Sequence, residues 1–189
     1  MTKNIMIVGV GGQGTLLTSR IIGKTALAAG YDVKISEVHG MAQRGGSVVT
    51  YVRFGDTVYE PVCEEGTVDV LIAFERLEAL RYAHFLKADG VLVVNDCRID
   101  PMTVTTGART YPEDIIATLE AAHTTLALDG GAIARELGNS RVLNSVILGR
   151  AARVIGFDEA AWLSVLAETV PQKTVAINEA AFRAGYAAK

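Results

Sequence analysis

The sequence contains little cysteine and no long hydrophobic run. Its two cysteines, Cys63 and Cys97, lie far apart and lack the spacing of metal ligands, so they cannot by themselves hold a zinc ion or an iron–sulfur cluster. We expect both thiols to be free in a reducing compartment. No segment approaches the roughly 18 apolar residues of a membrane span, and the apolar stretch 5–8 is too short for a signal peptide. The expectation is a soluble, cytoplasmic protein that has no membrane partner.

A strong excess of one charge is also missing. Lysine and arginine number 18 and aspartate and glutamate number 21, so the formal net charge is −3, with both signs interspersed. This balance provides no electrostatic reason to expect a nucleic-acid partner. Half of the 189 residues are hydrophobic, and no repeat, linker or low-complexity segment divides the chain. We therefore predict one domain over residues 1–189 with a substantial core.

A glycine-rich turn follows the first predicted strand. Residues 9–14 read Gly-Val-Gly-Gly-Gln-Gly, after the apolar run 5–8 and before a helical pattern that begins near Thr15. The pattern permits a sharp bend, and the helix N-terminus directs backbone N–H groups and the positive end of its dipole toward whatever lies above the turn. An anion or a polar loop of a partner chain fits there; alternatively, the glycines only let the strand and helix pack closely. The candidate binding residues of this turn are Gly9, Gly11, Gly12, Gln13 and Gly14.

The rest of the chain alternates between strand and helix patterns. Strands are predicted at residues 5–8, 31–36, 47–54, 58–59, 68–74, 90–95 and 124–128. Helices are predicted at residues 15–29, 75–86, 112–122, 131–137, 141–155, 159–169 and 173–184, the last closed by Gly185. Residues 101–111 have no regular pattern.

The spacing of the second and third strands departs from a purely parallel sheet. Only about ten residues separate strand 31–36 from strand 47–54, whereas a parallel crossover usually needs a dozen or more. We therefore predict an α/β fold with a Rossmann-like open sheet, mostly parallel, with an antiparallel strand or hairpin near 47–60 and a helical C-terminal end.

The segment 37–46, predicted to be a loop, is the second candidate site. It begins at the carboxyl end of a strand, which is the edge where open α/β sheets bind ligands. Arg44 beside two glycines suits a bidentate contact with a carboxylate or phosphate, although it could instead pair with Glu37 and pin the loop. His39 alone is as well explained by an ordinary loop histidine. The candidate binding residues of the segment are Glu37, His39, Gln43, Arg44, Gly45 and Gly46.

Glu37 also raises an alternative function. It follows the glycine turn by about twenty residues, where a dinucleotide-binding fold places the acid that holds a ribose hydroxyl. A free-standing NAD-dependent dehydrogenase is therefore an alternative. Against it, the chain has no second domain for a substrate and no recognisable catalytic pair of side chains.

Two of these stretches resemble a known family. The turn 9–14 and the segment 36–47, which reads Ser-Glu-Val-His-Gly-Met-Ala-Gln-Arg-Gly-Gly-Ser, together resemble the small (beta, gamma-type) subunit of 2-oxoacid:ferredoxin oxidoreductases. The amino-acid sequence of the segment is similar to that of the indolepyruvate branch rather than to those of the pyruvate or 2-oxoglutarate branches. The similarity continues through residues 74–81, 138–139, 144–149 and 178–182, and so covers nearly the whole chain.

The resemblance implies an accessory subunit of a thiamine-dependent complex. Such a complex decarboxylates indolepyruvate or a related aryl-pyruvate, transfers the acyl group to coenzyme A and reduces ferredoxin. In this family a larger partner subunit carries thiamine diphosphate, Mg and the [4Fe-4S] clusters. This chain has no Gly-Asp-Gly thiamine motif and too few cysteines for a cluster. We expect it to bind none of these cofactors alone, and we assign it no catalytic residue and no metal site.

Three kinds of function are consistent with these observations. The first is the accessory subunit, for indolepyruvate or for another 2-oxoacid such as pyruvate or 2-oxoglutarate. The second is the free-standing dehydrogenase, and the third is a structural module whose glycine turn contacts only protein. Within the first, the turn and the loop contact either coenzyme A or only the partner chain.

Overall fold

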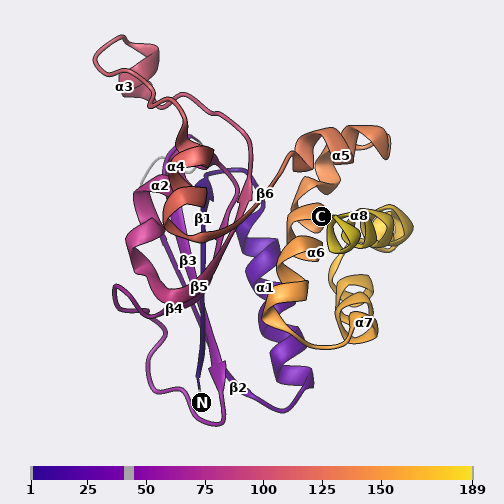
Figure 1. The fold of residues 1–189 in the computed structure, drawn as a ribbon. Helices are drawn as coiled ribbons and strands as arrows, with labels where there is room; N and C mark the ends of the chain where they lie inside the picture. The colour runs from indigo at the N-terminus through magenta and orange to yellow at the C-terminus, as the bar shows by residue number, and fades with distance from the viewer. Residues whose placement is uncertain (1, 41–44, 189) are drawn as a thin grey trace.

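The computed structural model describes residues 2–40 and 45–188. Two of the predicted site residues, Gln43 and Arg44, lie outside this range. A six-stranded sheet forms the centre of the molecule, in the order β2-β3-β1-β4-β5-β6 (Figure 1). Its strands are β1 (Lys3–Val10), β2 (Asp32–His39), β3 (Ser47–Gly55), β4 (Val68–Ala73), β5 (Leu86–Asn95) and β6 (Thr124–Leu128).

One strand runs against the others. β3 pairs antiparallel with both β2 and β1, whereas β1, β4, β5 and β6 pair parallel. The predicted antiparallel strand and the mostly parallel open sheet are thus confirmed. β3 lies between β1 and β2. In a dinucleotide-binding sheet the second strand is instead the direct neighbour of the first.

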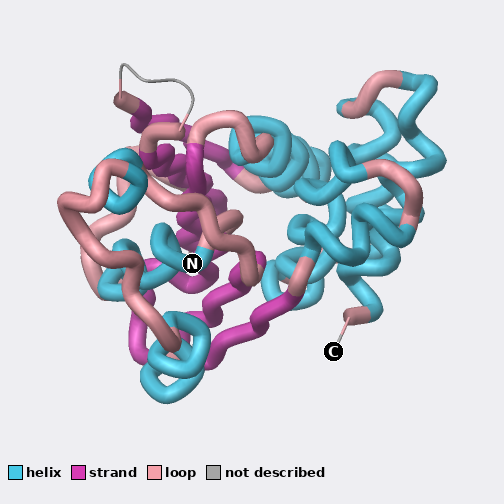
Figure 2. Tube along the Cα trace, turned by 90° about the horizontal axis from the view of Figure 1, so that it is seen from above, coloured by secondary structure: helices cyan, strands magenta, loops and turns pink. Residues whose placement is uncertain are grey.

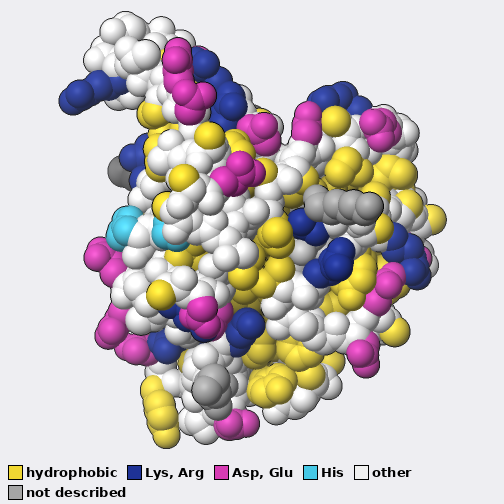
Figure 3. All heavy atoms as spheres, viewed as in Figure 1, with side chains coloured by type: hydrophobic (Ala, Val, Ile, Leu, Met, Phe, Trp, Pro, Cys, Tyr) yellow, Lys and Arg dark blue, Asp and Glu magenta, His cyan; other side chains and the backbone are white. Residues whose placement is uncertain are grey.

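Helices cover both faces of the sheet (Figures 1 and 2). One face packs against α1 (Thr15–Ala28), α5 (Gly130–Glu136), α6 (Leu143–Ile155), α7 (Glu159–Thr169) and α8 (Val175–Ala187). The other packs against α2 (Arg76–Tyr82) and α4 (Ile115–Ala122). A short helix, α3 (Met102–Thr105), has no buried residue and projects from the body. In Figure 3 the projecting end carries side chains of both charges, whereas apolar side chains gather over the C-terminal helices.

The two faces of the sheet have separate cores because side chains alternate along a strand. In β1, Ile5 and Ile7 belong to the core under α1 and α6, and Met6 and Val8 belong to the core under α2 and α4. All four are fully buried. Coverage of both faces explains the nearly continuous apolar sequence of the central strands.

The C-terminal helices meet at glycines. A Cβ atom on Gly149 of α6 would lie 2.0 Å from the Phe182 carbonyl oxygen, and one on Gly185 of α8 would lie 1.9 Å from the Val146 carbonyl oxygen. The two backbones are therefore in direct contact. The prediction that Gly185 closes the last helix is wrong: α8 continues to Ala187, and Gly185 serves the helix contact instead.

Several other predicted boundaries are wrong for identifiable reasons. Residues 37–39 extend β2 rather than opening a loop, because β3 pairs with β2 as far as His39. Residues 58–59 form no strand, since the Val58 N–H donates to the Asp32 carboxylate instead of to a ladder. Asp114 adopts a left-handed conformation (φ 54°), so α4 begins at Ile115 rather than at residue 112. Helix 75–86 ends earlier, in a 3₁₀ turn at Ala83–Phe85.

Candidate functional site

The glycine turn joins the carboxyl end of β1 to the start of α1. Gly12 (φ 102°) and Gly14 (φ 86°) adopt left-handed conformations, which L-residues with a side chain rarely accept. Gly14 immediately precedes α1; no side-chain hydrogen bond caps the helix there, and its first turn contains no acidic residue. The positive end of the α1 dipole is therefore not neutralised by a side chain of its own first turn.

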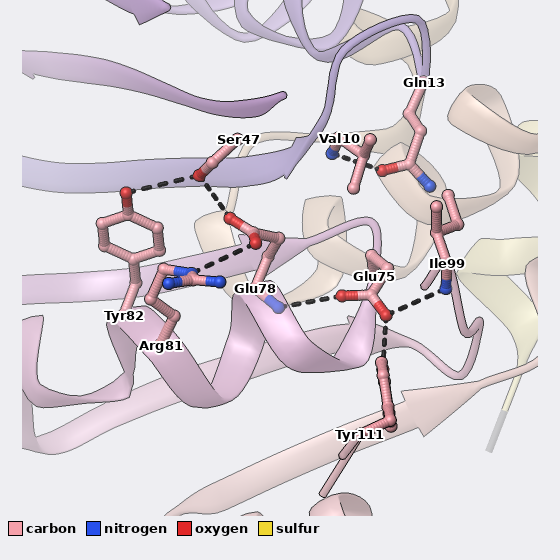
Figure 4. A network of polar contacts seen from close by, with 9 residues as sticks. All are labelled: Val10, Gln13, Ser47, Glu75, Glu78, Arg81, Tyr82, Ile99 and Tyr111. Carbon is pink, nitrogen blue, oxygen red and sulfur yellow. Dashed lines mark hydrogen bonds and ion pairs between the residues drawn. The ribbon is translucent and has the colours of Figure 1, made fainter. Parts of the chain in front are cut away.

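Gln13 turns back into the fold rather than toward a ligand. Its Oε1 accepts the Val10 N–H at 2.7 Å (Figure 4), and its Nε2 donates to the Phe74 carbonyl at 3.0 Å. A Cβ on Gly9 would lie 2.9 Å from Gln13 Oε1 and 3.1 Å from Phe74 Cβ. Gly9 thus leaves room for close packing. This agrees with the alternative interpretation of the turn, in which the glycines let the strand and the helix pack closely.

A second amide continues this bridge across the sheet. Asn95, at the end of β5, donates to the same Phe74 carbonyl at 3.1 Å and accepts the Gly130 N–H at 2.9 Å. The carboxyl ends of β1, β4 and β5 and the start of α5 are therefore connected by two side-chain amides. β1 and β4 lie where the strand order changes direction, which is where a dinucleotide would cross an open α/β sheet. Here the Gln13 side chain joins the ends of β1 and β4 at this place.

A groove of 430 Å³ opens on the other side of the turn, toward β2. Its lining residues are Gly11, Gly12, Gly14, Thr15, Leu16, Glu37, His39 and Val48. Because β3 is inserted, Glu37 lies two strand spacings from β1, or about 10 Å. Val48 of β3 lines the groove between them. The structure thus brings together five of the predicted site residues, Gly11, Gly12, Gly14, Glu37 and His39, in one groove.

The backbone before β3 closes onto the glycine turn. The Gly11 N–H donates to the Gly46 carbonyl at 2.9 Å, so the predicted site residues Gly45 and Gly46 lie beside the turn. His39 is exposed, and its Nδ1 lies 3.1 Å from the Gly40 carbonyl oxygen. The contact predicted for Arg44 stays a prediction, as does the role of Gln43.

Sequence reasoning missed a second cavity beside the turn. Gly12, Gln13 and Gly14 also line a volume of 430 Å³ together with Ser140, Arg141, Leu143 and Asn144. A Cβ on Gly14 would lie 2.9 Å from Asn144 Nδ2. The turn therefore separates two cavities, the groove toward β2 and the cavity beside residues 140–144. No local pattern places residues 140–144 there, because their position depends on how α6 packs against the sheet.

Sequence reasoning also missed a cluster of acids at the start of α2. Glu75 is 1% exposed, and its carboxylate accepts from the Tyr111 hydroxyl at 2.5 Å, the Ile99 N–H at 3.2 Å and the Glu78 N–H at 2.9 Å (Figure 4). Burial and this hydrogen bond raise the pKa of the Tyr111 hydroxyl above its usual range, so the hydroxyl acts as a donor. Glu78, 4% exposed, accepts from Ser47 Oγ.

Two other features are absent from the part of the chain that the structure describes. In residues 2–40 and 45–188, no group of three or more histidine, cysteine, aspartate or glutamate side chains is placed to hold a metal ion. Across the same residues, no helix has the length and apolar character needed to cross a membrane. Cys63 is buried in the core under α2 and α4, while Cys97 follows β5.

Comparison with known proteins defines the class. Residues 4–188 match the family described as pyruvate ferredoxin/flavodoxin oxidoreductase. The chain belongs to this family, and the resemblance inferred from the turn and the loop is confirmed.

Individual relatives indicate which members of the family this chain is similar to. The chain is 44% identical to the indolepyruvate oxidoreductase subunit IorB of Pyrococcus horikoshii, over 96% of this chain and 93% of the relative. Its fold is similar to a keto/oxoacid ferredoxin oxidoreductase gamma subunit from Geobacter sulfurreducens (25% identity, 97% and 96% of the two chains, TM-score 0.73). It is also similar to part of the 2-oxoglutarate:ferredoxin oxidoreductase of Magnetococcus marinus, with coenzyme A and succinyl-CoA bound (21% identity, TM-score 0.74); the match covers 98% of this chain and 30% of that one.

Proposed function

We propose that this chain is the accessory subunit of a complex that oxidatively decarboxylates indolepyruvate and related aryl-pyruvates to the aryl-acetyl-CoA. The observation that carries the assignment is the 44% identity to an IorB subunit along almost the whole of both chains. A pyruvate synthase subunit and a 2-oxoglutarate synthase subunit of Methanothermobacter marburgensis are 30% and 29% identical. The distance between these values favours the indolepyruvate branch over another 2-oxoacid.

In this proposal the cofactors lie on one chain and a substrate-binding groove lies on another. A large partner subunit holds thiamine diphosphate, Mg and the [4Fe-4S] clusters, which supply the decarboxylation and electron-transfer chemistry, and ferredoxin accepts the electrons. Among the residues that the structure describes, the lining of the groove includes one carboxylate, one imidazole and no thiol. Its residues are suited to binding and orienting a substrate and to excluding water when the partner covers them.

We assign coenzyme A to the groove between the glycine turn and β2. Its 430 Å³ is within the usual range of about 300–1,000 Å³ for ligand pockets. The α1 N-terminus lies on one side, where the helix dipole favours a phosphate, and Leu16 adds an apolar surface. Glu37 lines the groove from β2, which lies two strand spacings, or about 10 Å, from β1.

Two features of the geometry disfavour the dehydrogenase alternative. The inserted β3 separates β2, which carries Glu37, from β1, whereas a dinucleotide-binding sheet places the two strands side by side. Gln13 also bridges β1 and β4 where the second half of a dinucleotide would lie.

A charge placed in the groove tests the coenzyme A assignment. Leu16 is 41% exposed in the first turn of α1, where an acid is compatible with the helix dipole. In a complex reconstituted with the large subunit, Leu16→Glu should raise the KM for coenzyme A by about tenfold through repulsion of its phosphates. The KM for the 2-oxoacid and the assembly measured by size-exclusion chromatography should be unchanged.

The same helix provides a matched control. Leu27, 58% exposed, lies near the other end of α1, away from the groove. Leu27→Glu should leave the KM for coenzyme A unaltered. An unchanged KM in Leu16→Glu would exclude coenzyme A from the groove, and loss of assembly would indicate a surface that contacts the partner chain instead. A higher kcat/KM for pyruvate than for indolepyruvate would overturn the substrate assignment.

A further inference from the structure

The first turn of α2 carries two buried carboxylates that do not line the groove. Glu75 and Glu78 lie one helical turn apart, are 1% and 4% exposed, and project from the α2 side of the sheet. A buried carboxylate is costly unless its oxygens accept hydrogen bonds. The partners of these two acids therefore show which parts of the chain they hold in place.

Glu75 connects α2 to the projecting segment that contains α3. Its side chain accepts from Ile99, which precedes this segment, and from Tyr111, which follows it. Glu75 also accepts the Glu78 N–H, which is one of the free donors at the start of α2. The first turn of α2 is thus fixed by contacts at both ends of residues 100–110.

Glu78 connects this fixed turn to the start of β3. One of its oxygens accepts the Ser47 hydroxyl, and the other accepts from Arg81 Nε at 3.2 Å. The residue before Ser47 is Gly46, whose carbonyl accepts the Gly11 N–H. A continuous path of hydrogen bonds and covalent bonds therefore leads from Glu78 through Ser47 and Gly46 to the glycine turn.

The path ends in the groove. Gly11 lines it directly, and Val48, the residue after Ser47, lines it between the turn and β2. Because the Ser47 side chain points toward Glu78, the backbone on both sides of Ser47 is fixed where the groove is formed (Figure 4). A shift of the first residue of β3 would displace the Gly11 contact and the Val48 side chain together.

We propose that Glu78 and Ser47 are positioning residues for the coenzyme A groove: their hydrogen bond sets the distance between the glycine turn and the start of β3. This inference rests on the proposed function of the groove. It predicts that breaking the contact weakens coenzyme A binding without altering the chemical step, because neither residue lines the groove.

Substitutions at Ser47 test the contact with little risk to folding, since the residue is exposed. In the reconstituted complex, Ser47→Ala should raise the KM for coenzyme A by on the order of tenfold, as expected for the loss of a hydrogen bond to a charged group, with kcat nearly unchanged. Ser47→Thr keeps the hydroxyl and suits a strand, so it should restore the KM. A merely structural role would lower the melting temperature of Ser47→Ala and leave the KM unaltered.

A double-mutant cycle tests whether the two residues act through each other. Glu78→Gln should also raise the KM for coenzyme A, and the double variant Ser47→Ala/Glu78→Gln should be no worse than the poorer single variant. Glu120→Gln is the matched control, because Glu120 is exposed on α4. Independent, multiplicative effects of the two substitutions would overturn the proposal.

Hydrogen exchange provides a readout that does not depend on activity. In the assembled complex, the peptide that contains Gly11 should exchange faster in Ser47→Ala and return to the native rate in Ser47→Thr, because the Gly11 N–H donates to Gly46. Unchanged exchange and an unchanged KM would refute the positioning role. If Leu16→Glu raises the KM while Ser47→Ala does not, only this inference fails; if Leu16→Glu has no effect, the groove assignment itself fails.

Discussion

Glycine serves opposite purposes at the turn between β1 and α1 and at the contact of α6 with α8. A Cβ on Gly12 would meet no atom of the described residues within 4 Å, whereas a Cβ on Gly149 would lie 2.0 Å from a carbonyl oxygen. Gly12 is needed for its left-handed backbone, and Gly149 for the absence of a side chain. Gly12 lines the groove, while the space beside Gly149 is filled by another helix.

The comparison shows why one set of glycines is visible in the sequence and the other is not. The glycines of the turn lie within six residues, so their spacing forms a pattern. Gly149 and Gly185 belong to different helices, and their contact exists only after the chain has folded. A glycine that serves a long-range contact has no local signature.

The largest expected effect is at the helix contact. Gly149→Ala or Gly185→Ala should destabilise the protein by about 3 kcal/mol or more, since a backbone contact cannot relax by side-chain rotation. This corresponds to a fall in Tm of roughly 6–12 °C for a chain of this size. Calorimetry of the complex measures it. Gly40→Ala is the control, because a Cβ there would have no neighbour within 4 Å among the residues that the structure describes. A similar Tm fall in that variant would contradict the explanation.

A smaller effect on stability is expected at the turn, with a larger effect on function. Gly12→Ala places a side chain on a backbone with φ 102°, at a cost of about 1–2 kcal/mol. The methyl group also enters the groove, so the KM for coenzyme A should rise more than in either helix-contact variant. Equal KM changes at Gly12 and Gly149 would remove the distinction between the two sets of glycines.

The smallest expected effect is the pH dependence of stability that comes from the Cys63 thiol. It sets the pH range in which these variants should be compared. Burial raises the pKa of the Cys63 thiol to about 11. Because this folded-state pKa exceeds the unfolded value of about 8.5, the stabilising contribution of the protonated thiol is complete below pH 8.5 or so and is lost as the pH rises toward 11. Urea midpoints measured from pH 8 to 10.5 should fall more steeply in the native protein than in Cys63→Ala. Parallel slopes would contradict the shift.

Much of the fold follows from local spacing. The ten residues between the second and third strands were enough to predict that β3 is antiparallel, because that connection is too short for a crossover. The end of β2 was not predictable in the same way. Glu37 and His39 look like loop residues by composition, yet pairing with β3 holds them in a strand.

The candidate site was predictable where neighbours in sequence are also neighbours in space. Gly11, Gly12, Gly14, Glu37 and His39 share the groove, since both stretches end at the carboxyl edge of the sheet. Residues whose role depends on tertiary packing gave no signal. Glu78 lies in the stretch 74–81 that resembles the family, but its contact with Ser47, which lies 31 positions away in the sequence, is seen only in the structure.

The antiparallel course of β3 has a consequence for how the family could diversify. A parallel crossover leaves the ligand edge, traverses the molecule and returns at the opposite end. Here β2 ends and β3 begins at the same edge, with His39 paired to Val48. A change in the length of the connection between them therefore need not alter the register of either strand. The pairing of the strands is thus independent of how long this connection is, which a parallel crossover that must span the molecule does not allow.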